Sequence, residues 1–280
     1  MVGDEADSFD IIFAMLLQEY TLRASEDHGE TFRDGSPAVT ALAYFFRDAA
    51  SYDAKFTHLQ GALLETWRHC GKLKTVVVTN QIGAALAQFA ARYPWVEAQV
   101  EPSLVPGDID TLSRDCISKL GDRFSTPYVL TVQDDGFPLR DGLEEFVDLG
   151  YDFIGAPFCR DLPLPRLLTR ILRFAPMNGG FSLRSQKACR IAAGYWRRFY
   201  ASDAFRDDFI EDNFYTSYLP RRHIGFWARI RPCPCDIAAR FSTDASVPLN
   251  LRTGLPFGFH GTVAFKILQE RFPVRFCRAS

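Results

Sequence analysis

Short apolar runs alternate with segments of helical periodicity along the first half of the chain. The runs predict strands because each is rich in β-branched or aromatic residues; they cover Ala41–Phe46, Thr75–Thr79, Trp95–Val100 and Tyr128–Val132. The segments between them predict helices, which begin near Tyr52, Ile82 and Ile109 and end at Gly71, Pro94 and Gly121. Repeated βα units of this length predict an α/β fold with a mostly parallel central sheet flanked by helices.

The alternation continues for a short distance beyond the fourth run and then stops. A short helix is predicted over Gly142–Leu149 and a strand over Tyr151–Ile154. The chain after Pro157 is rich in Pro, Arg and aromatic residues, which is typical of irregular segments that build the substrate side of a site. We predict an N-terminal helical extension and loop over residues 1–38 and a single domain over residues 39–280.

Four arginines lie in the irregular region, at Arg160, Arg166, Arg170 and Arg173. Leucine and isoleucine residues interleave with them, so an amphipathic helix with a solvated basic face is favoured. The alternative is a basic lid that screens a diphosphate or selects an anionic acceptor.

Composition limits the classes of function. The chain has 280 residues, of which 47% are hydrophobic and 24% charged, as expected for a globular protein. The formal net charge of -2 gives no electrostatic reason to expect nucleic acid as the main partner. The apolar stretch Phe9–Leu17 is shorter than the ~20 residues that cross a bilayer, and acidic residues precede it. We therefore expect no secretion signal and no transmembrane segment.

The seven cysteines are odd in number and mostly scattered, which favours reduced thiols over a disulfide framework. Cys233 and Cys235 form a close pair, but no second pair completes a zinc site. Structural thiols are the favoured interpretation, and with the missing signal peptide they point to a cytoplasmic location.

The turn Gln133-Asp134-Asp135-Gly136 directly follows the fourth apolar run. Its acids therefore lie at the carboxyl end of a buried strand, where open α/β sheets bind ligands. Carboxylates there can hold a divalent cation that neutralises the phosphates of a nucleotide. The turn favours a nucleotide-dependent transferase, and the structural alternative is an acidic surface turn that caps the next helix.

Five blocks in order carry a family resemblance: Val132–Phe137, Tyr151–Pro157, Asn178–Arg184, Glu211-Asp212 and Phe257–Gly261. Together they resemble an uncharacterised family of GT-A-like glycosyltransferases. The resemblance implies a nucleotide-binding half over residues 39–157 and an acceptor-binding, metal-completing half over residues 158–280. It also implies a Mn²⁺- or Mg²⁺-dependent enzyme that moves a sugar from a nucleoside diphosphate sugar to a hydroxyl of a glycan, lipid or protein acceptor.

The same resemblance implies roles for individual residues. Asp135 and His260 are the expected metal ligands. The expected donor-binding residues are Asp48, Asn80, Gln133, Asp134 and Arg184. The loop Asn178, Gly179 and Gly180 is expected to face the sugar and the acceptor, because adjacent glycines let a ligand approach the backbone. Asp212 is the expected general base, with Glu211 as the second choice.

Each assignment has a structural alternative. His260 is otherwise a satisfied structural histidine, the glycine pair a tight turn, and Glu211-Asp212 a pair that stabilises a helix N-terminus. Gln133 replaces the first acid of the usual Asp-x-Asp turn, so a binding or scaffold protein without turnover is the second hypothesis. A nucleotidyltransferase is the third, although it would carry a glycine-rich loop where this chain has Asp48-Ala49-Ala50-Ser51.

Overall fold

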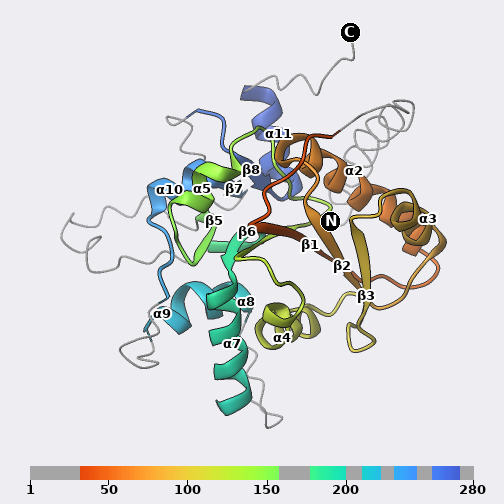
Figure 1. The fold of residues 1–280 in the computed structure, drawn as a ribbon, viewed down its shortest axis with the longest axis horizontal. Coiled ribbons are helices and arrows are strands. Elements are labelled where there is room, and N and C mark those ends of the chain that lie inside the picture. Colours follow the sequence, from red (N-terminus) through yellow and green to blue (C-terminus); the bar gives the residue numbers. More distant parts are fainter. Residues whose placement is uncertain (1–31, 158–176, 200–209, 222–229, 245–253, 272–280) are drawn as a thin grey trace, which may run out of the picture.

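The computed structural model describes residues 32–157, 177–199, 210–221, 230–244 and 254–271 (Figure 1). Most of the predicted N-terminal extension therefore lies outside the described residues, as does the arginine-bearing segment.

A six-stranded sheet with strand order β3-β2-β1-β4-β6-β5 forms the centre of the protein. Its strands are β1 (Val39–Phe45), β2 (Lys74–Thr79), β3 (Val96–Val100), β4 (Tyr128–Val132), β5 (Phe153–Pro157) and β6 (Met177–Ser185). The first four strands are mutually parallel, and β6 runs antiparallel to both of its neighbours. The predicted class, a mostly parallel α/β sheet flanked by helices, is confirmed.

Two groups of helices cover this sheet (Figure 1). In one group, α2 (Tyr52–Cys70) contacts α3 (Ala84–Arg92); in the other, α4 (Ile109–Ser118) contacts α7 (Gln186–Phe199). Right-handed crossovers explain the division. The chain moves outward from β1 to β3 and then returns to the far side of β1 to form β4, so α4 falls on the opposite face from α2 and α3.

Local signals account for the helix ends. Gly71 adopts a φ of 79° immediately after α2 and donates its backbone N–H to the Trp67 carbonyl. The Asp108 carboxylate accepts the backbone N–H groups of Asp110 and Thr111, so α4 begins at Ile109 although that side chain is exposed. The third predicted helix therefore begins at the expected residue. The second was expected to begin near Ile82 but begins at Ala84, two residues after that exposed side chain.

The glycines at 179 and 180 do not precede a strand as predicted; they lie inside β6. The pairing with β5 is interrupted there, since Gly155 pairs with Ser182 but Ala156 pairs with Asn178. Residues 179–181 therefore have no partners on β5 and form a bulge, defined here as the β6 bulge. Bulges of this kind re-aim side chains and are frequent beside active sites.

The remaining elements pack beside the sheet. They are α5 (Leu143–Asp148), α8 (Glu211–Asn213), the π-helix η2 (Phe214–Tyr218), α9 (Leu219–Arg221), α10 (Cys235–Phe241), α11 (Thr262–Arg271), the short 3₁₀ helix η1 (Leu120–Asp122), and the strands β7 (Ser242–Asp244) and β8 (Gly258–His260). The last two strands pair in parallel and place Asp244 beside His260. No helix among the described residues is long and apolar enough to span a membrane.

Among the described cysteines, Cys70, Cys116, Cys189 and Cys233 are free and buried. Cys235 is disulfide-bonded. The prediction of reduced thiols is therefore wrong for Cys235, and the sequence gave no local signal for the bond.

Candidate active site

The carboxyl ends of β1 and β4 meet where the strand order changes direction, which is where open α/β sheets form a ligand-binding crevice. Arg47 follows β1, and its Nη2 donates to Asp134 Oδ2 across this point at 3.2 Å. The side-chain amide of Asn80, which follows β2, accepts the Arg47 backbone N–H and donates to the Arg47 carbonyl. Three strand ends are thus joined through one arginine.

The acidic turn closes on itself beyond β4. Gln133 and Gly136 exchange backbone hydrogen bonds of 3.0 and 3.1 Å, and the Asp135 carbonyl accepts the Gly261 N–H. Asp134 points toward Arg47, whereas Asp135 Oδ1 lies 3.6 Å from His260 Nε2. The two acids of the turn therefore face different partners, and only Asp135 faces the histidine.

The His260 ring is held from both sides. Its Nδ1 lies 3.0 Å from Asp244 Oδ2 and its Nε2 lies 2.9 Å from Gln133 Oε1. Burial alone would lower the pKa of His260, but the hydrogen bond with Asp244 and the charge of Asp135 raise it overall. Burial raises the pKa of Asp135, and the nearby charge of Asp134 adds to that effect while His260 opposes it.

The β6 bulge lies against this histidine. Gly180 donates its backbone N–H to Asn178 Oδ1 at 2.7 Å, and Asn178 Nδ2 in turn donates to Asp244 Oδ2 at 3.0 Å. A Cβ at Gly180 would lie 2.2 Å from His260 Nε2 and 2.7 Å from Gln133 Oε1. The side chains of His260 and Gln133 thus occupy the space that a residue other than glycine would need.

The acid pair lies on the other side of the same bulge. Glu211 is 7% exposed, and its backbone N–H and Oε2 both contact Ser113 Oγ of α4, at 3.4 and 3.3 Å. Asp212 is only partly buried, yet its Oδ1 has no solvent contact and no hydrogen-bond partner. Burial, and then the negative charge of Glu211, raise the pKa of Asp212.

A buried arginine contacts this pair. Arg184 is 1% exposed, and its Nη2 lies 3.6 Å from Glu211 Oε1. A Cβ at Gly179 would meet Arg184 Nη2 and Asp212 Oδ1, each at 2.3 Å, and Glu211 Oε1 at 2.9 Å. Arg184 was predicted among the donor-binding residues, but the structure places its guanidinium inside the protein beside the acid pair.

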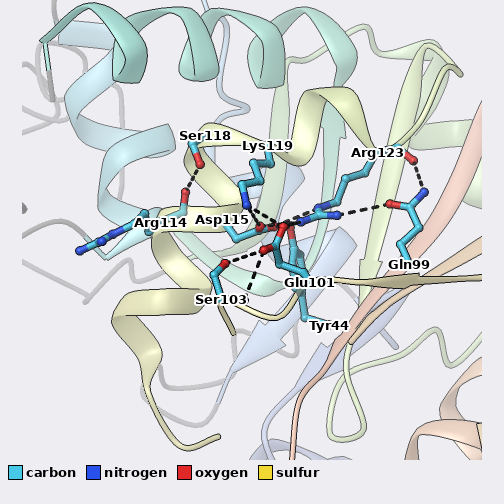
Figure 2. Close-up of polar contacts among 9 residues, drawn as sticks. All are labelled: Tyr44, Gln99, Glu101, Ser103, Arg114, Asp115, Ser118, Lys119 and Arg123. Carbon is cyan, nitrogen blue, oxygen red and sulfur yellow. Dashed lines mark hydrogen bonds and ion pairs between the residues drawn. The ribbon is translucent and has the colours of Figure 1, made fainter. Parts of the chain in front are cut away.

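The helix that carries Ser113 is anchored by an ionic network around the buried Asp115 (Figure 2). Asp115 of α4 is 3% exposed and accepts hydrogen bonds from Tyr44 Oη at 2.8 Å and from Arg123 Nε at 2.9 Å. Glu101, which follows β3, accepts from Lys119 at 2.6 Å and from Arg123 at 3.2 Å. The network fixes α4 against the ends of β1 and β3, and so fixes the position from which Ser113 reaches Glu211.

Residues 116–260 match the model of a family described as "Protein of unknown function (DUF5672)", which covers more than half of the chain. The chain belongs to this family. No curated protein matches it.

Solved structures resemble the DUF5672 chain only distantly. A mannosyltransferase from Pyrobaculum calidifontis, solved with GDP-Man and Mn²⁺, is 15% identical with a TM-score of 0.35; the match covers 66% of this chain and 56% of the enzyme. Mouse xyloside xylosyltransferase 1 is 12% identical with a TM-score of 0.44, covering 80% and 97%. The glycosyltransferase GlyE from Streptococcus pneumoniae is 12% identical with a TM-score of 0.46, covering 81% and 54%. The chain thus spans little more than half the length of the first and third proteins, and likenesses this weak carry no conclusion about its activity.

The side chains around His260 fit a divalent cation by their chemistry and spacing. Two ligands of one Mn²⁺ or Mg²⁺ ion lie ~3 to 4 Å apart when each is ~2.1 Å from the metal, and Asp135 Oδ1 lies 3.6 Å from His260 Nε2. Asp244 at Nδ1 is the usual outer partner of a metal-bound histidine, because a proton held on Nδ1 lets the Nε2 lone pair bind a metal. Among the described residues, no group of three or more His, Cys, Asp or Glu side chains forms a metal-binding cluster. Gln133 Oε1 is a further oxygen beside the pair, 2.9 Å from His260 Nε2.

The structure groups the predicted residues in three places. Asp135, His260, Gln133, Asn178 and Gly180 lie together, and Glu211, Asp212, Gly179 and Arg184 lie on the other side of the β6 bulge. Asn80 and Asp134 lie with Arg47 at the strand ends, whereas the exposed Asp48 accepts hydrogen bonds from Ser51 before α2. The sequence reasoning missed three members of these contacts, Arg47, Ser113 and Asp244. Only Arg47 had a usable signal, since it directly follows a predicted strand.

Proposed function

We propose that this DUF5672 protein is a metal-dependent glycosyltransferase that moves a sugar from a nucleoside diphosphate sugar to an acceptor hydroxyl. One observation carries the proposal. The glycines of the β6 bulge bring the Asp135–His260 pair and the Glu211–Asp212 pair to opposite sides of one backbone segment. A cation site for a diphosphate and a carboxylate base for a hydroxyl are the two parts that such a transfer needs.

In this proposal Asp135 and His260 hold the cation, with Gln133 beside them. A nitrogen ligand favours Mn²⁺ over Mg²⁺, because Mg²⁺ prefers oxygen ligands. The ion would stabilise the charge of the departing nucleoside diphosphate. The nucleoside would lie over the strand ends at Asp48, Asn80 and Asp134.

Asp212 is the proposed base. Of the two acids it is the one with partial exposure, whereas Glu211 is enclosed by Ser113 and Arg184. As the acceptor oxygen bonds to the anomeric carbon, its proton passes to the Asp212 carboxylate. The bond between that carbon and the diphosphate oxygen breaks at the same time, and its electron pair leaves with the nucleoside diphosphate. Attack from the face opposite the leaving group inverts the configuration.

The test is calorimetric titration of the protein with uridine and guanosine diphosphate sugars, each with and without Mn²⁺. We expect Mn²⁺-dependent binding of at least one donor, abolished in Asp135→Asn. Asp148→Asn is the matched control, because it removes one carboxylate from the exposed end of α5 and the proposal gives Asp148 no part in binding. It should retain Mn²⁺-dependent binding.

Two results would decide against the proposal. Failure to bind any donor would exclude the transferase. Donor binding without transfer to any acceptor and without donor hydrolysis would favour a binding or scaffold protein, which the neutral Gln133 in the turn makes the second candidate.

A further inference from the structure

Arg184 is held by hydrogen bonds and ring contacts with several groups of the protein. Its Nε donates to Ser182 Oγ at 2.9 Å, and its Nη2 donates to the Gly179 carbonyl at 3.0 Å. Its Cζ lies 5.1 Å from the ring centroid of Phe153 and 4.8 Å from that of Tyr215, within the range of cation–π attraction. A guanidinium in this position is oriented by its surroundings before any substrate binds.

The Gly179 carbonyl is the point where these contacts meet. Besides Arg184, the hydroxyls of Thr131 and Ser182 lie 2.8 and 2.9 Å from this oxygen. Three donors at one carbonyl fix the start of the β6 bulge firmly, and Arg184 is the only one of the three that also contacts the acid pair.

Charge also links Arg184 to Asp212. Arg184 Nη2 and Asp212 Oδ1 each lie 2.3 Å from one point, the Cβ position of Gly179. They are therefore at most about 4.6 Å apart, a distance at which opposite charges stabilise each other strongly. Cys116, Glu211, Tyr215 and Cys189 also act on Arg184, and none of these four is a cation.

Resting on the proposed function, we propose that Arg184 is a positioning residue: it holds Glu211 and Asp212 against the β6 bulge as their counter-charge and does not contact the donor diphosphate. Its Nη1 is buried without a hydrogen-bond partner, as is Asp212 Oδ1. Unpaired buried groups are costly and rare, and a functional role is one explanation for keeping them.

The experiment follows the titration of the Asp212 carboxyl by ¹³C NMR, with the signal assigned through Asp212→Asn. We expect Arg184→Met to raise the Asp212 midpoint by at least one pH unit, a tenfold change in its proton affinity, because the counter-charge is lost. Calorimetry should show donor binding within threefold of the wild type. An unchanged Asp212 midpoint would overturn the proposal. If donor binding were also weakened more than tenfold, a contact between Arg184 and the donor phosphate would be indicated instead.

Two further variants keep the test decisive if Arg184→Met does not fold. The double variant Arg184→Met/Glu211→Gln removes both members of the pair and should be at least as stable as the single variant, since no charge of Glu211 remains unpaired. Phe153→Leu removes one ring and leaves the guanidinium, and it should shift the Asp212 midpoint upward by several tenths of a unit. A double variant less stable than the single one, or no shift in Phe153→Leu, would contradict the positioning role.

The two proposals fail in different ways. A shifted Asp212 midpoint in a protein that binds no donor would leave Arg184 as positioning residue and exclude the transferase. Normal donor binding and transfer with an unshifted Asp212 midpoint would support the transferase and contradict the positioning role of Arg184.

Discussion

Gly180→Ala tests the arrangement around His260 most directly. Gly180 does not have a positive φ, so its backbone would accept alanine without strain. The added methyl would instead meet His260 Nε2 at 2.2 Å and Gln133 Oε1 at 2.7 Å, where ordinary contacts begin at 3.4 Å. The imidazole must therefore move by about 1 Å, although Asp244 holds its opposite nitrogen.

The displacement of His260 sets the loss of stability expected for Gly180→Ala. Overpacking of a filled site costs ~1–3 kcal/mol, and weakening a hydrogen bond to a charged group adds ~1.5–3 kcal/mol. The overpacking cost and the hydrogen-bond cost arise from one movement of His260 and do not add in full. We therefore expect a loss of ~2–4 kcal/mol in the free energy of unfolding. At ~2–4 °C per kcal/mol for a protein of this size, Tm should fall by ~5–15 °C.

Gly194→Ala is the matched control. Gly194 lies inside α7, and an added Cβ there meets nothing within 4 Å. Alanine should stabilise this position by ~0.5–1 kcal/mol, because it reduces the freedom of the unfolded chain. Both variants are compared by urea denaturation and by Mn²⁺ titration, and Gly180→Ala should also bind Mn²⁺ at least ~10-fold more weakly. If Gly180→Ala were as stable as the wild type with unchanged Mn²⁺ affinity, the proposed contact between the bulge and His260 would be refuted.

Two further expectations concern charged groups away from the bulge. Arg123→Met removes the main partner of the buried Asp115 and should cost ~3 kcal/mol, the lower end of the range for a broken buried pair because Lys119 still contacts that carboxylate; a loss below ~1 kcal/mol by urea denaturation would contradict this. His69 is the second case. Burial alone lowers its pKa, but hydrogen bonds with Glu65 and Asp141 raise it above the ordinary value. A raised pKa in the folded state stabilises the protein below ~pH 6.5, and that stabilisation is lost as pH rises through the folded-state value. The stability advantage of the wild type over His69→Gln should therefore shrink as pH rises above ~6.5, and a difference independent of pH would exclude the linkage.

The βα units could be predicted because their signals are local. The run Tyr128–Val132 forms β4 with the predicted bounds, and the helix that ends at Gly71 does so through that residue's positive φ. Some predicted helix ends differ from the observed ones. The second helix was predicted to begin near Ile82, but Ile82 is exposed and α3 begins at Ala84. The glycine pair was placed before a strand because its sequence alone is typical of a turn, whereas the pairing of Asn178 and Met177 with β5 extends β6 beyond the glycines.

In the candidate site, too, some features could be predicted from the sequence and others only from the structure. The sequence singled out Asp135, His260 and the acid pair, and the family resemblance named Asp135 as the metal ligand in preference to Asp134. The partners of the two acids came only from the structure, in which Arg47 binds Asp134 from the end of another strand and Asp135 faces His260. Asp244 could not be found at all, because its relation to His260 exists only through the pairing of β7 with β8.

The sequence by itself determined the order of strands and helices, the acidic turn at the end of β4 and the chemical types available for a site. Those features depend on periodicity and turn chemistry within short stretches of chain. Only the tertiary structure decided which acid faces His260, that Arg184 is buried beside Glu211, and that two glycines separate the metal candidates from the acid pair. These contacts join residues up to 127 positions apart, as between Gln133 and His260, and such distances are set by the packing of whole elements.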